Sequence, residues 1–127
     1  MIVNIPISIG ELVDKITILE IKAMHIQDPK KRTFIEKELK LLNDIYQHLT
    51  HSPALNQAAL SLKQINQELW DIEDNIRECE HKKDFSETFI QLARSVYVTN
   101  DKRAEIKRTI NQLTGSTLSE VKSYEEY

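Results

Sequence analysis

The sequence predicts an all-α protein built as an antiparallel bundle of four helices, or of five if the last helix breaks. Only 2 Gly and 3 Pro occur in 127 residues, so little interrupts regular structure. Apolar residues recur every three or four positions along most of the chain, which is typical of amphipathic helices. The length fits one domain with one core. We therefore expect a single domain over 1–127, with a bundle at 8–115 and a polar tail at 116–127.

The first helix is expected at about 9–27. Ser8 is placed to cap its N-terminus, and Glu11 three residues later completes a capping box. Its core stripe consists of Leu12, Ile16, Leu19, Ala23 and Ile26. Further apolar residues widen this surface, so we expect the helix to be contacted on more than one side.

The second helix is expected at about 29–49, with Asp28 as N-cap and Pro29 in the first turn. Its apolar face consists of Phe34, Ile35, Leu39, Leu42, Ile45, Tyr46 and Leu49. Ser52 and Pro53 repeat the same pattern and predict the start of a third helix.

The third helix should end near Lys83 and has the most regular pattern in the chain. Its apolar positions alternate between spacings of three and four: Leu55, Ala58, Leu62, Ile65, Leu69, Ile72, Ile76 and Cys79. Such a heptad seam is typical of a helix that pairs with another along its whole length.

The fourth helix is expected at about 85–114, opened by a capping box of Asp84 and Glu87 and ended by Gly115. Its seam consists of Phe85, Phe89, Leu92, Val96, Ile106, Ile110 and Leu113. The β-branched run 96–99 and the capping residues that follow it leave a kink or a break near Asn100 open.

Helix lengths predict a further feature. At 1.5 Å per residue the first two helices are about 30 Å long and the last two about 45 Å. Short connections make neighbours antiparallel, so the longer hairpin should extend beyond the shorter one. The extension would carry the apolar residues Ile76, Cys79, Phe85, Phe89 and Leu92. We expect a second copy or a partner protein to cover them, or a bent helix to fold back.

A polar stripe runs beside the seam of the third helix. Residues 68–80 hold six acidic residues against Arg77, a local charge of −5. Antiparallel pairing sets Glu73 opposite Arg94, which is the expected counter-ion. Seven residues near this stripe could bind a small anionic ligand: Trp70, Glu73, Arg77, Arg94, Tyr97, Arg103 and Lys107. The alternative is that they form interhelical salt bridges that set the register of the helices.

Other chemistry has weaker support. The pairs Glu11/Asp14 and Glu68/Asp71 each share a helix face, and Mg²⁺ is often held in this way. They resemble the carboxylate pairs of all-α nucleoside triphosphate pyrophosphohydrolases, but such pairs also arise by chance among 20 acidic residues. We expect no metal site and no cofactor. Cys79 lies on the apolar seam and is expected to be a core residue.

The charge balance and the N-terminus bear on partners and location. A net charge of −3 argues against nucleic acid, and a basic patch at 102–108 is diluted by two acids. The apolar start at 1–7 is short and has no basic residue, so we expect neither a targeting segment nor a membrane span. With one cysteine only, a cytoplasmic location is expected.

Several segments together resemble one family. They are SIGELVDKITILEIK at 8–22, LWDIEDNIR at 69–77, FIQLARSVY at 89–97 and NDKRAEIK at 100–107. They look like a family of small uncharacterised bacterial proteins, a domain of unknown function. The resemblance implies that relatives are sometimes encoded near, or joined to, glycosyltransferases of surface-polysaccharide assembly, and it assigns no catalytic residue. A weaker similarity, to helical chorismate mutases, implies that Arg77, Arg94 or Lys107 points into a cavity.

The sequence thus favours a non-enzymatic interaction or adaptor module that self-associates or binds a partner protein. The alternative is a binding domain or enzyme for a nucleotide, a nucleotide sugar or a dicarboxylate. Arginines paired with acids would favour the first hypothesis. Arginines that line an open pocket without acid partners would favour the second.

Overall fold

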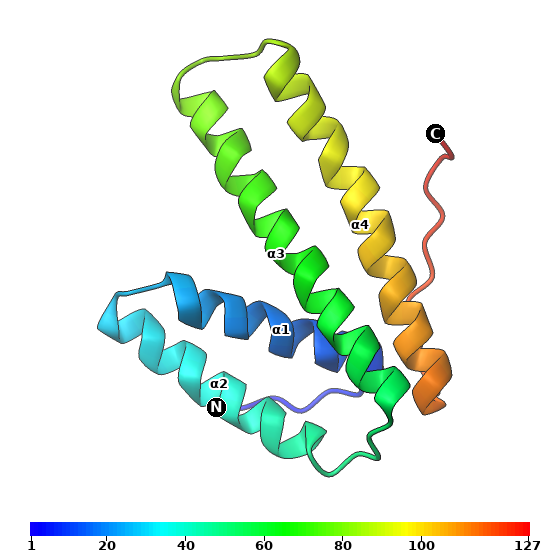
Figure 1. The fold of residues 1–127 in the computed structure, drawn as a ribbon. Helices are drawn as coiled ribbons and strands as arrows, with labels where there is room; N and C mark the ends of the chain where they lie inside the picture. The colour runs from blue at the N-terminus through cyan, green and yellow to red at the C-terminus, as the bar shows by residue number, and fades with distance from the viewer.

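The structure, a computed structural model covering residues 1–127, consists of four α-helices and no strand (Figure 1). In chain order they are α1 (Ile9–His25), α2 (Pro29–Tyr46), α3 (Pro53–His81) and α4 (Glu87–Thr114). The predicted all-α class with four helices is confirmed. Since α4 runs without interruption, the chain has no break near Asn100.

Three of the predicted N-caps are confirmed. The side chains of Ser8, Asp28 and Ser52 each accept a hydrogen bond, at 3.1 Å, from the backbone nitrogen three residues later. These bonds satisfy amides that have no partner inside the helix. Gly115 ends α4 in the left-handed conformation, with φ of 63°, as predicted.

The predicted capping box of α4 is wrong. Ser86 occupies the N-cap position, and the helix begins at Glu87, two residues later than expected. Lys83 has a φ of 56°, which turns the chain sharply after α3. In this turn the Asp84 carboxylate accepts a hydrogen bond of 3.0 Å from the backbone nitrogen of Ser86. Asp84 therefore stabilises the turn and is not available to cap the helix.

The helices form two hairpins that cross. The α1–α2 hairpin lies across one end of the longer α3–α4 hairpin, with α1 against it (Figure 1). Helix α1 contacts all three other helices, whereas α2 packs against α1 alone. This arrangement confirms that α1 is contacted on more than one side. It also makes α2 an outer layer of the molecule.

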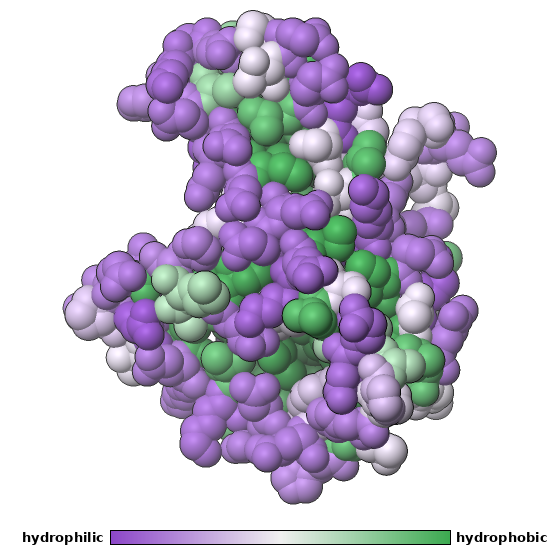
Figure 2. Space-filling model, in the orientation of Figure 1, coloured by the Kyte–Doolittle hydropathy of each residue, from purple (hydrophilic) through white to green (hydrophobic).

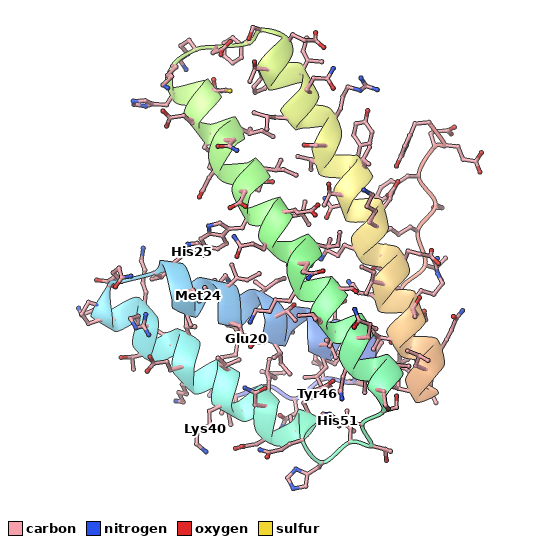
Figure 3. The ribbon with its side chains drawn as sticks, viewed as in Figure 1. Glu20, Met24, His25, Lys40, Tyr46 and His51 are labelled. Atoms are coloured by element: carbon pink, nitrogen blue, oxygen red, sulfur yellow. The ribbon has the colours of Figure 1, made fainter.

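The core lies where the hairpins cross. Its centre consists of Val13, Leu55, Leu62 and Ile110, all at most 2% exposed. Nearby, the ring of His51, in the connection between α2 and α3, lies tilted against the ring of Tyr46 at the end of α2, with centroids 4.4 Å apart (Figure 3).

The apolar face predicted for α2 is only partly buried. Ile35 is its one buried residue, while Phe34 and Ile45 are 76% and 56% exposed. These two residues of the predicted apolar face stay exposed because α2 has one neighbouring helix and an amphipathic stripe wider than that contact.

The α3–α4 hairpin extends well beyond α1, as the helix lengths predict (Figure 1). We call residues 71–98 the free half of the hairpin. Cys79 is the only buried residue in it. The polar tail runs back along α4, where the ring of Tyr127 lies 5.0 Å from that of Tyr97. No helix combines the length and the apolar character that a bilayer crossing requires.

Candidate functional site

A buried carboxylate, that of Asp14, lies at the crossing of the two hairpins. Asp14 is 1% exposed. Its Oδ1 accepts hydrogen bonds of 2.9 Å from Arg103 Nε and from Asn66 Nδ2. Its Oδ2 accepts a second bond from Arg103, through Nη2. The guanidinium thus holds the carboxylate in bidentate fashion, and these bonds raise the pKa of Arg103.

A second cation, Lys107, lies next to this pair. Its side chain is 10% exposed. The ammonium lies 2.8 Å from Glu11 Oε2, 3.1 Å from Glu120 Oε2 and 3.9 Å from Asp14 Oδ2. Burial alone would lower the pKa of Lys107, but the hydrogen bond to Glu11 and the charge of Asp14 outweigh it and raise that pKa. Lys107 is therefore held in its charged form by surrounding carboxylates.

We call this group the buried polar network; its members are Glu11, Asp14, Thr17, Asn66, Arg103, Lys107 and Glu120. Every buried side-chain nitrogen and oxygen in the chain has a hydrogen-bond partner. Both oxygens of Asp14 accept bonds within the network. The carboxylate pair Glu11/Asp14 contacts Lys107. The network therefore fits a structural role, joining α1 to α3 and α4.

Gly10 allows the close approach that brings these residues together. A Cβ atom on Gly10 would lie 2.5 Å from the carbonyl oxygen of Lys107 and 2.9 Å from Asn111 Oδ1. The same Asn111 oxygen accepts a hydrogen bond of 2.7 Å from the backbone nitrogen of Gly10. The start of α1 is thus bound directly to α4.

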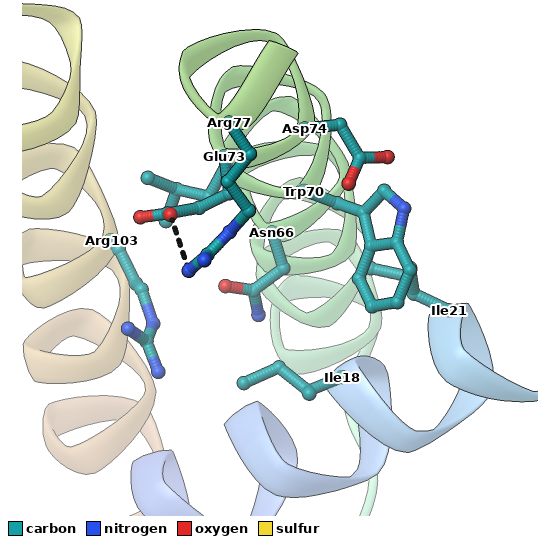
Figure 4. A pocket seen from close by; sticks show the side chains of 9 residues that line it. Ile18, Ile21, Asn66, Trp70, Glu73, Asp74, Arg77 and Arg103 are labelled. Atoms are coloured by element: carbon teal, nitrogen blue, oxygen red, sulfur yellow. Dashed lines mark hydrogen bonds and ion pairs between the residues drawn. The ribbon is translucent and has the colours of Figure 1, made fainter. Parts of the chain in front are cut away.

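An open pocket of about 360 Å³ lies beside the network, between α1, α3 and α4 (Figure 4). We call it the crossing pocket. Its apolar lining consists of Ile18, Ile21, Leu69 and Trp70, and its polar lining of Asn66, Glu73, Asp74, Arg77 and Arg103. The indole of Trp70 stacks on His25 at the end of α1, with ring centroids 5.0 Å apart (Figure 3).

Both arginines of the crossing pocket have acid partners. Arg77 Nη2 lies 3.3 Å from Glu73 Oε2, one turn earlier on α3 (Figure 4). Arg103 is bound to Asp14. Asp74 adds a further negative charge to the pocket lining. The pocket therefore presents a mixed surface with no excess of positive charge.

The structure brings together four of the seven predicted ligand residues, since Trp70, Glu73, Arg77 and Arg103 all line the crossing pocket. Lys107 belongs to the buried polar network instead. Tyr97 is 43% exposed and contacts the tail at Tyr127.

Arg94 is exposed on α4 and forms no ion pair. The expectation that it is the counter-ion of Glu73 is therefore wrong. Arg77 takes this role because residues four apart on one helix are close neighbours.

Sequence reasoning missed the bond between Asp14 and Arg103, which are 89 positions apart. One indication was available: Asp14 lies among the core-facing positions of the first helix, beside Val13 and Ile16. A charge at such a position requires a partner. Periodicity alone does not say which residue supplies it.

The five residues predicted to lie on the hairpin extension, and to be covered there, differ in exposure. Ile76, Phe89 and Leu92 are half-buried, Phe85 is 53% exposed and Cys79 is buried. Figure 2 shows hydrophobic side chains at the surface along the line between α3 and α4, far from α1 and α2.

Comparison with known proteins identifies the family. A family model described as a family of unknown function (DUF6165) matches residues 3–127, and the chain belongs to this family. The resemblance inferred from the sequence to a domain of unknown function is thereby confirmed. No curated protein and no solved structure matches the chain.

Proposed function

We propose that the protein is a non-enzymatic interaction module that self-associates through the free half of the α3–α4 hairpin. One observation carries the proposal: apolar seam residues continue to the tip of the hairpin, yet Cys79 is the only buried residue between 71 and 98. Two helices that pack only on each other leave part of each seam in water.

The exposed apolar side chains of the free half support this proposal. Phe85 and Ile90 are 53% and 46% exposed, and Phe89 and Leu92 are half-buried beside them. Clustered apolar surface of this kind is typical of a protein interaction site. A second copy of the hairpin packed against the first gives a four-helix bundle, which buries such seams efficiently. Symmetric pairing of identical surfaces is the commonest route to a dimer.

The charges at the crossing also favour an interaction module over an enzyme. Arg77 and Arg103 each have an acid partner, and Asp14 already accepts bonds at both oxygens. These contacts fix α1 on the hairpin. The free thiol of Cys79 is buried, which fits a reducing compartment, and we place the protein in the cytoplasm.

Sedimentation velocity over a range of concentrations tests the proposal. The wild type should shift from the 14.8 kDa mass of one chain to twice that mass as concentration rises. Ile90→Asp, in the free half, should abolish the shift. Phe34→Asp is the matched control, because Phe34 is exposed on α2, outside the proposed surface. A wild type that stays monomeric throughout, or equal effects of both variants, would refute the proposal.

The crossing pocket supports a second candidate function, the binding of a small anionic ligand such as a nucleotide, a nucleotide sugar or a dicarboxylate. Its volume of about 360 Å³ lies within the range of small-molecule sites. The pocket joins the indole of Trp70 to two guanidinium groups, each with more N–H donors than its acid partner uses. Because both guanidinium groups already have acid partners, we rank ligand binding below self-association.

Thermal unfolding with a panel of such anions tests the second candidate. A ligand at 100 times its Kd adds about 2.7 kcal/mol to the free energy of unfolding. For a chain of 127 residues this raises Tm by about 10 °C. Arg77→Gln should remove the shift, and Arg94→Gln, an exposed arginine outside the pocket, should retain it. A panel without any shift would exclude this function for the compounds used.

A further inference from the structure

We propose that two copies pair through α4, antiparallel, in a register that sets Glu87 of each copy against Arg94 of the other. This inference rests on the proposed self-association and specifies its geometry. It starts from a stripe along one side of α4 in the free half, formed by the N-cap residue Ser86 and by Ile90, Ala93 and Tyr97.

The stripe has the spacing of a helix-pairing surface. Its members follow one another at intervals of four, three and four residues, and so lie on one face of α4. None is buried: Ile90 is 46% exposed, and Tyr97 is 43% exposed even with the ring of Tyr127 in the tail 5.0 Å from its own ring. Large and small residues alternate along it. A helix face of this kind packs well against a second one that offers a small residue opposite each large one.

Of the antiparallel and the in-register parallel pairing of two α4 helices, only the antiparallel one sets a small residue opposite each large one. When a two-fold axis relates two antiparallel helices, any residue faces a residue of the second copy. The numbers of the two facing residues add up to the same total along the whole pair. A sum of 183 sets Ile90 opposite Ala93 of the second copy, and Tyr97 opposite Ser86 of the second copy. Each large residue then faces a small one. A parallel pair in register would set Ile90 against Ile90 and Tyr97 against Tyr97.

The charges beside the stripe point to the same register. Glu87 and Arg94 follow Ser86 and Ala93 directly, so they flank the stripe on one side. In antiparallel helix pairs the flanking positions on one side meet each other. Glu87 and Arg94 of the second copy have a sum of 181, which sets them two residues, or about 3 Å along the helix axis, from direct opposition. Their long side chains span this offset, and the two-fold axis repeats the contact. In a parallel pair, flanking positions from opposite sides of the stripe meet, so Glu87 and Arg94 would not contact each other.

Neither Glu87 nor Arg94 forms an ion pair within the chain. Other acids and bases of the free half form ion pairs, namely Glu73–Arg77, Glu78–Lys82 and Glu80–Lys83. Glu87 and Arg94 are exposed and form none. Glu87 only accepts a hydrogen bond of 2.6 Å from the neutral side chain of Gln91. An unused acid and an unused base two turns apart, beside an exposed apolar stripe, form a self-complementary surface.

Charge exchange tests the register by sedimentation velocity on the full chain. Glu87→Arg and Arg94→Glu should each weaken self-association about tenfold, because both symmetric contacts become repulsive. The double variant E87R/R94E should associate within about threefold of the wild type. An equimolar mixture of the two single variants should form a heterodimer, since every contact between them is again between opposite charges.

The outcomes separate this inference from the function on which it rests. A monomeric wild type overturns both. Two results with a dimeric wild type would overturn the register alone. One is that the single variants associate as tightly as the wild type, and the other is that E87R/R94E does not regain the affinity lost in the single variants. Because Glu87 and Arg94 are exposed and form no ion pair, the circular dichroism spectrum of each variant should show the same helical content as that of the wild type. Lys40→Glu on α2, also exposed, is the control for change of net charge.

Discussion

The buried carboxylate of Asp14 gives a direct test of what holds α1 on the α3–α4 hairpin. Asp14→Asn removes the charge and keeps the size of the side chain. In the structure Asp14 is 1% exposed and binds Arg103, whose side chain is 27% exposed. The change leaves this guanidinium partly buried without its acid partner, and it presents an amide N–H₂ where the network supplies only donors.

The expected loss in the free energy of unfolding follows from how deeply the ion pair is buried. Removing one partner of a buried ion pair costs about 3–5 kcal/mol, and the partial exposure of Arg103 sets the expected loss near the lower end, at about 3 kcal/mol. The entropy of unfolding is about 2.1 cal/mol/K per residue, so in a chain of 127 residues each kcal/mol moves Tm by about 4 °C. We therefore expect a fall of about 12 °C.

Urea denaturation and thermal unfolding, both followed by circular dichroism, measure this loss. Asp44→Asn is the matched control, because Asp44 pairs with Lys40 on α2 at 3.4 Å and its side chain is 51% exposed. An exposed pair of this kind contributes less than about 1 kcal/mol. If Asp14→Asn lowered Tm no more than Asp44→Asn does, the buried polar network would not be what fixes α1.

Two further predictions concern the surroundings of the network. Gly10→Ala should lower the free energy of unfolding in urea by about 1–3 kcal/mol, because the new Cβ would lie 2.5 Å from the carbonyl oxygen of Lys107; a neutral effect would contradict the packing of α1 on α4. The hydrogen bond from Lys107 lowers the pKa of Glu120 below its ordinary value of 4.5. The stability that Glu120 contributes is thus present above pH 4.5 and lost as pH falls through the lowered pKa, so the Tm of Glu120→Gln should approach that of the wild type in acid. A difference in Tm that stays constant down to acid unfolding would contradict this contact.

The sequence predicted those parts of the fold that depend on near neighbours. Ser8, Asp28 and Ser52 cap their helices through bonds to an amide three residues away, and such contacts are visible in the sequence. At Asp84 the same rule failed, because the turn at Lys83 uses that carboxylate before the helix begins. The Asp84 carboxylate could either cap the helix or stabilise the turn, and the sequence pattern does not show which of these two contacts is more stable.

Contacts between distant segments were predicted less well, for a physical reason. An apolar stripe reports the side of a helix that avoids water, but not how many neighbours share it. Phe34 lies on the predicted apolar face of α2, yet it is exposed because α2 packs against α1 alone. Antiparallel pairing correctly joined α3 to α4, yet it assigned Glu73 to Arg94 when the nearer Arg77 was available on the same helix.

The buried polar network and the free half of the hairpin are linked by the position of α1. An apolar contact alone would be satisfied wherever α1 met the long seam of α3 and α4, because hydrophobic burial is not directional. Asp14 binds Asn66 on one helix and Arg103 on the other, and only one level of the hairpin offers both donors. Buried ionic groups are best attested as devices that fix such a register. At this level α1 covers the base of the hairpin and leaves Cys79 as the only buried residue in 71–98, which is the condition that the proposed pairing of α4 with a second copy requires.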